Sequence, residues 1–171
     1  MDRMCPDTSN SLVCQPGARI GKVKAMLTKL QTTSNVEHLV LVAGTNHIPS
    51  EKPATVRGKM KGLIHFAQDL FPSTKIYLSS ILPKIDCGIT PAISELNDSL
   101  RRTCKRLGVD FIYNQQFFPS DDSDITPLLA RDCIHLSKKG VATLAGNIRY
   151  RLQKFGDLSF GSRQPREDQQ E

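Results

Sequence analysis

The sequence predicts an α/β protein with a parallel β-sheet and crossover helices, and three observations support this. Short apolar runs alternate with amphipathic stretches along the chain, which is typical of strands joined by helices. The clearest run, residues 36–43, is continuously apolar from Leu39 to Ala43, as expected of a central parallel strand covered on both faces. The length of 171 residues corresponds to a single domain.

The predicted strands are short apolar runs bounded by turn-forming residues. They are expected at residues 11–14, 36–43, 75–80 and 109–113, and the first is the weakest. Pro16-Gly17 marks a turn after the first strand, and Pro72-Ser73 precedes the third. The order of these runs along the chain therefore alternates with the order of the helices.

The predicted helices carry apolar side chains at intervals of three and four residues. They are expected at about residues 20–30, 55–70, 91–107 and 138–155. Gly108 is a suitable stop for the third helix, and Ser137 is a suitable N-cap for the fourth. Residues 114–131 lack a regular pattern, and so long a loop in a compact domain is either functional or disordered.

The polar segment from residue 156 onward predicts a disordered tail. The expected organisation is therefore one domain over residues 1–155, followed by the tail over residues 156–171. We find no internal repeats.

The composition excludes a membrane protein. Hydrophobic residues make up 39% and charged residues 23%, and no run approaches the roughly 18 apolar residues of a membrane-spanning helix. The first residues lack the apolar stretch of a signal peptide, which predicts an intracellular protein. The five cysteines are scattered without a Cys-x-x-Cys pair, so we expect free thiols, mostly buried, and no zinc site.

The net charge of +6, with a pI near 9.2, is compatible with an acidic or phosphate-rich partner. The positive residues are spread over three of the predicted helices. We therefore favour solvated helix faces over a nucleic-acid-binding patch, and keep RNA or DNA as the weaker alternative.

Two short segments could carry chemistry, because ligands of α/β proteins bind beyond the carboxyl ends of parallel strands. Gly44-Thr45-Asn46 directly follows the strongest predicted strand, and the carboxamide of Asn46 could donate to a developing oxyanion. In isolation, an asparagine that tolerates a tight turn explains this segment better.

The second segment contains Asp132 and His135. Three residues apart on one turn, the two side chains can touch: Asp132 would accept the Nδ1–H of His135 and leave Nε2 to act as a general base. Taken alone, a surface pair before a helix is the more frequent explanation.

Together and in this order, the segments resemble those of the SGNH (GDSL-like) hydrolase superfamily, from about residue 11 to residue 155. The resemblance implies a flavodoxin-like, three-layer α/β/α fold with no cofactor or metal, acting on ester substrates. It implies that Gly17, in Pro16-Gly17-Ala18-Arg19, and Asn46 are oxyanion donors, and that Asp132 and His135 are the acid and base. The wording of HLVLVAGTNHI and DCIHLSKKGVATLAGNI is similar to esterase-like domains of vertebrate non-LTR retroelements.

The sequence departs from the family pattern at two places. His47 follows Asn46 where the family usually has Asp, and an imidazole is larger and lacks the negative charge, so the hydrogen bonding of this loop is open. In addition, no Gly-Asp-Ser block precedes Pro16, so no nucleophile is found. Ser79 and Ser80 end a later strand and could face the crevice, but the family does not place its nucleophile there.

The missing block implies that the first strand of the family fold, which lies inside its sheet, is missing too. Either the first two predicted strands pair directly, or the N-terminal segment is loose, or a longer chain is the functional form. The expected function is an ester-hydrolase scaffold that lacks its serine and is inactive as written. The alternatives are a retroelement-derived nucleic-acid or protein interaction module, and a non-functional remnant or mis-started reading frame.

Overall fold

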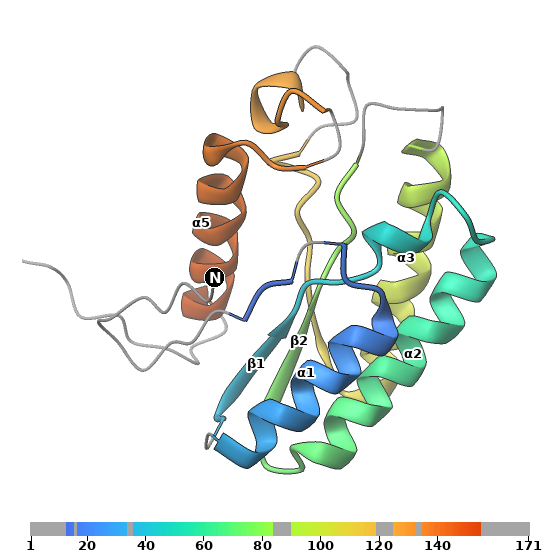
Figure 1. Ribbon diagram of the computed structural model, residues 1–171, viewed down its shortest axis with the longest axis vertical. Helices are drawn as coiled ribbons and strands as arrows, with labels where there is room; N and C mark the ends of the chain where they lie inside the picture. Colours follow the sequence, from blue (N-terminus) through green and yellow to red (C-terminus); the bar gives the residue numbers. More distant parts are fainter. Residues whose placement is uncertain are drawn as a thin grey trace, which may run out of the picture.

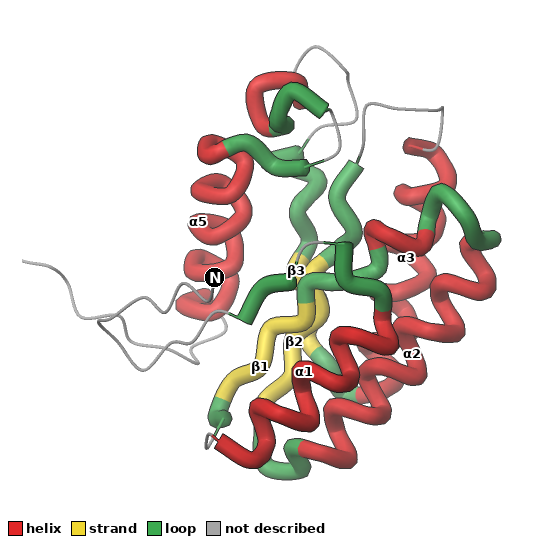
Figure 2. Tube along the Cα trace, in the orientation of Figure 1, coloured by secondary structure: helices red, strands yellow, loops and turns green. Residues whose placement is uncertain are grey.

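The computed structural model describes residues 13–15, 17–33, 36–83, 90–118, 125–132 and 135–154. They form three layers, with a parallel sheet between helices (Figures 1 and 2). This confirms the α/β/α fold predicted from the sequence. The predicted tail over residues 156–171 lies outside the described residues.

The sheet of the described residues has three parallel strands in the order β1-β2-β3. They are β1 (His38–Leu41), β2 (Lys75–Ser79) and β3 (Asp110–Ile112). Leu39 of β1 lies beside Ile76 of β2, and Leu78 of β2 lies beside Phe111 of β3. Each of these strands falls inside an apolar run that the sequence identifies as a strand.

Four α-helices connect and cover the strands. They are α1 (Ile20–Thr33), α2 (Pro53–Leu70), α3 (Thr90–Leu107) and α5 (Lys138–Lys154). In Figure 1, α1, α2 and α3 lie on one side of the sheet and α5 lies on the other. Helix α2 begins two residues before the predicted start because Pro53 suits the first helical turn, where its missing N–H has no intrahelical partner anyway.

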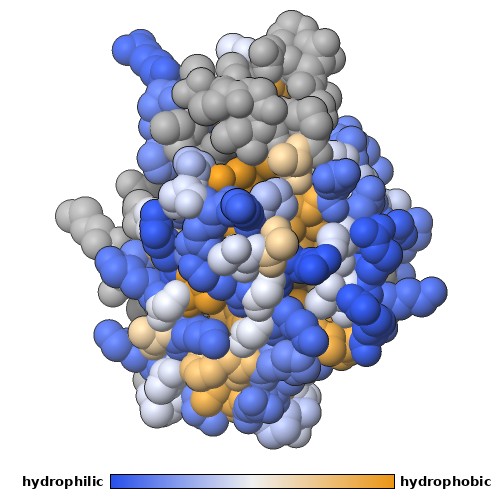
Figure 3. All heavy atoms as spheres, turned by 90° about the vertical axis from the view of Figure 1, so that its right-hand side faces the viewer, coloured by the Kyte–Doolittle hydropathy of each residue, from blue (hydrophilic) through white to orange (hydrophobic). Residues whose placement is uncertain are grey.

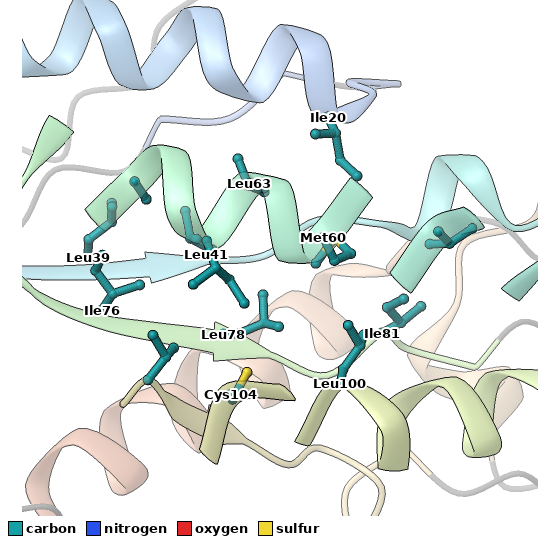
Figure 4. Close-up of a cluster of buried hydrophobic side chains, with 14 of the residues drawn as sticks. Ile20, Leu39, Leu41, Met60, Leu63, Ile76, Leu78, Ile81, Leu100 and Cys104 are labelled. Carbon is teal, nitrogen blue, oxygen red and sulfur yellow. The ribbon is translucent and has the colours of Figure 1, made fainter. Parts of the chain in front are cut away.

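The alternation of side chains along the strands builds a core on each face of the sheet. Leu39, Leu41, Ile76 and Leu78 point into the larger cluster with α1, α2 and α3 (Figure 4). On the other face, buried Tyr77 and Ile112 pack with Leu152 of α5, and Val40 packs against them. Strand β1 therefore has apolar contacts on both faces, as its continuous apolar run predicts.

The cysteines that the structure describes divide between core and surface. Cys104 is buried among the residues of the larger core cluster, and that burial, with Asp110 nearby, raises the pKa of its thiol to about 12. Cys14 is exposed. Cys104 thus behaves as the small buried hydrophobic residue that the sequence predicts, whereas Cys14 does not.

The weak strand predicted at residues 11–14 is wrong for the part that the structure describes. Val13 and Cys14 are irregular, and Val13 is 55% exposed. A strand inside a parallel sheet would have helices over both faces, and neither of these residues is covered in that way. Ser11 and Leu12, like Ser9, lie outside the described residues.

Candidate active site at the carboxyl ends of the strands

The loop after β1 carries Asn46 and begins with a glycine that no other residue could replace easily. Gly44 has a φ of 107°, and a Cβ at this position would lie 2.9 Å from Cδ1 of Ile81. The chain then forms a short 3₁₀ turn, η1 (Thr45–His47). Gly44 thus lets the backbone turn tightly against the core and places Asn46 and His47 just beyond the end of β1.

The side chain of Asn46 reaches the segment that contains Gly17. Its Nδ2 donates a hydrogen bond to the carbonyl oxygen of Ala18 over 3.1 Å. An amide nitrogen has two hydrogens, so one remains for a ligand. Gly17 has a φ of 68° and is exposed. The two residues suggested as oxyanion donors are therefore in neighbouring segments, joined through Ala18.

His47 forms the hydrogen bonds that the sequence left open. Only 4% of its surface is exposed, and its Nε2 accepts the backbone N–H of Ile20 at 3.0 Å. In the neutral ring the proton then lies on Nδ1, which donates to Oε1 of Glu51 over 2.7 Å. The imidazole thus supplies an acceptor to the first turn of α1, where a backbone N–H lacks an intrahelical partner. The size and neutrality of the ring do not prevent this.

Glu51 extends this arrangement to α2. Its Oε1 also accepts from Nζ of Lys59 at 2.7 Å. The hydrogen bonds from Lys59 and then from His47 hold the pKa of the Glu51 carboxyl below its usual range. Nothing in the sequence analysis identified this group, although Glu51 and Lys59 are close enough in the sequence to flank the same helix start.

Asp132 and His135 form the predicted pair. Nδ1 of His135 lies 2.6 Å from Oδ2 of Asp132, and the backbone N–H of His135 donates to Oδ1 at 2.9 Å. The two side chains are 63% and 47% exposed, with His135 the more open. One carboxylate therefore fixes both the backbone and the ring of His135. With Nδ1 engaged, Nε2 is the ring nitrogen that can exchange a proton with a ligand.

The segment that carries the pair is anchored to α5. Ser137 accepts the N–H of Gly140 at its Oγ over 3.1 Å, as an N-cap does, and donates to the carbonyl of Pro127 at 2.9 Å. Pro127 belongs to the turn η2 (Thr126–Leu128), and Leu129 forms a β-bridge with Leu136. The irregular region predicted from the sequence is thus ordered close to His135.

Ser79 and Ser80 are buried and cannot serve as an open nucleophile. They are 0% and 3% exposed. Nδ2 of Asn114 donates to their hydroxyl oxygens at 2.8 and 3.0 Å, and Oδ1 of Asn114 accepts from Asn147 at 2.6 Å. This buried network joins β2 to α5. The sequence analysis missed Asn114 and Asn147, although Asn114 follows β3 as Asn46 follows β1.

The only room beside this network is small. A cavity of about 20 Å³, close to the size of one water, is lined by Ser80, Asn97, Asn114 and five other residues outside the loop that holds Asn46, together with Ile81. Gly17, Asn46, Asp132 and His135 do not line it. Figure 1 shows α5 starting at the end of the sheet toward which the strands point, so the two pairs of residues share this end.

Neither a metal centre nor a membrane-spanning helix is found in the part of the chain that the structure describes. No three His, Cys, Asp or Glu side chains gather there in a way that could hold a metal ion. Within the same ranges, no helix has both the length and the apolar character needed to cross a bilayer.

The fold resembles those of several solved esterases. A GDSL-like lipase from Bacteroides thetaiotaomicron is 16% identical with a TM-score of 0.67, over 81% of this chain and 73% of that one. The lipase/acylhydrolase from Enterococcus faecalis is 18% identical with a TM-score of 0.62, over 81% and 72%. A carbohydrate esterase of family 3 from Talaromyces cellulolyticus is 18% identical with a TM-score of 0.66, over 93% and 81%.

These identities are low, so the likeness establishes the fold alone. No protein-family model matches the sequence, and no curated protein does. The chain therefore has the fold of GDSL-like lipases and acylhydrolases, and its activity has to be argued from its own residues.

Proposed function

We propose that this chain is an SGNH-hydrolase-like domain, an ester-hydrolase scaffold that lacks its serine nucleophile and does not turn over esters by itself. The single observation that carries this proposal is the contact between Nδ1 of His135 and Oδ2 of Asp132, at 2.6 Å and near the surface. A carboxylate that orients an exposed imidazole is the acid–base half of a hydrolase triad.

The positions of Gly17 and Asn46 add support. Asn46 is tied to Ala18, next to Gly17, and keeps one amide hydrogen for a ligand. In the proposed site, these residues would bind the carbonyl oxygen of a small ester, and His135 would act as a base. The kinship with retroelement domains and the intracellular location stay predictions.

The proposed lack of a nucleophile limits the chemistry. Ser79 and Ser80 are buried and engaged with Asn114, so they offer no accessible hydroxyl. Without an acyl-serine, His135 could only activate water, a route that lacks the covalent intermediate. In a serine hydrolase, losing the nucleophile reduces kcat by about 10⁶.

Hydrolysis of p-nitrophenyl acetate tests the proposal. We expect no turnover above buffer from the full chain, and no covalent labelling by a fluorophosphonate probe, which reacts with activated serines. His65→Ala is the matched control for His135→Ala, because His65 is exposed on α2. Turnover that disappears in His135→Ala and persists in His65→Ala would show an active enzyme and overturn the proposal.

A further inference from the structure

A groove with an excess of positive charge runs between α2 and α3, away from the candidate active site. The two helices pack side by side. Near one end, Nη1 of Arg57 on α2 donates to Oγ of Ser99 on α3 at 3.2 Å, and at the other end Gln68 donates to the carbonyl of Leu107 at 2.9 Å. The groove has a volume of about 460 Å³, and its lining residues are Arg57, Ser99, Arg102, Lys105 and Arg106.

Four of the five lining residues are cations, and none is acidic. All four cations are exposed. The nearest ion pair on α3 joins Asp98 to Arg101, which does not line the groove, and its atoms are 3.9 Å apart. A solvated helix face usually mixes both signs of charge, whereas here cations from two helices converge on one hollow.

The surface around the groove is hydrophilic. Figure 3 views this side of the molecule, where blue residues predominate and smaller hydrophobic areas show between them. The large exposed hydrophobic residues of the described chain lie on neither α2 nor α3; they are Val13, Val42, Phe117, Val141 and Tyr150. A membrane-binding face would combine its cations with apolar anchors, so a lipid surface does not fit this groove.

The spacing and the type of the cations point to phosphate groups. Arg102 and Arg106 are four residues apart on α3, which separates them by about 6 Å along the helix axis. This is comparable to the distance between successive phosphates of an extended nucleic-acid strand. The planar fork of arginine also matches phosphate oxygens in pairs.

We propose that the groove between α2 and α3 binds the phosphate backbone of a single-stranded nucleic acid. No aromatic residue lines the groove, so it offers no platform on which bases could stack. Binding therefore depends on charge and not on base sequence. The site is independent of the proposed hydrolase site, because Asp132 and His135 precede α5 on the other side of the sheet (Figure 1).

The test measures the binding of a fluorescent 20-nucleotide single strand to the full chain by anisotropy, at a series of salt concentrations. We expect binding at low salt that weakens steeply as salt rises, because counterions are released from the strand. In Arg102→Gln/Lys105→Gln, we expect affinity to fall about tenfold at low salt. The slope of log K against log salt should decrease by about 1.4, the value for two lost phosphate contacts.

A matched variant separates the groove from net charge. Lys139→Gln/Lys154→Gln removes two exposed cations from α5 and should leave the slope close to that of the wild type. Equal losses in the two double variants would overturn the proposal, as would the absence of binding at low salt. Competition by poly-glutamate as effective as that by unlabelled oligonucleotide would also overturn it, since the groove would then not distinguish phosphate from carboxylate.

Discussion

Nε2 of the buried His47 accepts the backbone N–H of Ile20 at the start of α1, with the two nitrogens 3.0 Å apart. Asn46, one residue earlier, binds the carbonyl of Ala18, two residues before Ile20. The loop after β1 therefore holds the segment that contains Gly17 through two adjacent side chains. This arrangement makes the first turn of α1 depend on the identity of residue 47.

Replacement of His47 should lower stability according to whether the new side chain can accept a hydrogen bond. His47→Leu leaves the N–H of Ile20 and the Glu51 carboxylate without this partner, and should cost about 1–3 kcal/mol of the free energy of unfolding. His47→Gln keeps an oxygen near the position of Nε2 and should cost less. Urea denaturation of both variants checks this, and equal losses would contradict the acceptor role.

Sequence reasoning identified the fold here because its elements are local patterns. The continuous apolar run around Val40 and the helical spacing around Leu63 indicate a buried strand and a covering helix without knowledge of any partner. The contact of Asp132 with His135 was also predictable, because three residues on one turn bring side chains together.

The remaining features depend on residues that are far apart in the sequence. His47 meets Ile20 after a separation of 27 residues, and Asn114 meets Asn147 after 33. No periodicity encodes such contacts. The best available signal for Asn114 is its position directly after a strand, which is also the signal that identified Asn46.

The pH dependence of stability should reveal the role of Glu51. Lys59 and His47 hold the pKa of its carboxyl below the ordinary value of 4.5, so folding favours the ionised form. The stabilisation is complete above the unfolded pKa and disappears as the pH falls through the lower, folded value. In urea denaturation between pH 3 and 7, Glu51→Gln should differ most from the wild type near neutrality and least in acid.

An exposed glutamate provides the comparison for Glu51. Glu95 lies on the surface of α3, so Glu95→Gln should follow the wild-type curve across the same range more closely than Glu51→Gln does. If both variants lost stability in parallel, the loss would reflect net charge and not the contacts of Glu51 with Lys59 and His47.

Asn114→Ala should be among the most destabilising substitutions in this chain. The side chain is 1% exposed and serves Ser79, Ser80 and Asn147 together, so its removal leaves buried polar groups without partners. We expect a loss of about 3 kcal/mol in the free energy of unfolding. Gln116→Ala, at an exposed position in the next turn, should change it by less than about 0.5 kcal/mol.

Two glycines of α5 should respond in opposite directions to the same substitution. A Cβ on Gly140 would lie 2.0 Å from the carbonyl oxygen of Leu128, whereas a Cβ on Gly146 would meet nothing within 4 Å. Gly146→Ala should therefore stabilise the helix by about 0.5–1 kcal/mol through its better helix propensity. Gly140→Ala should destabilise it, because α5 must move away from η2 to relieve the clash. Thermal denaturation measures both changes, and an increase in Tm for both variants would show that α5 does not pack as closely on η2 as the backbone places it.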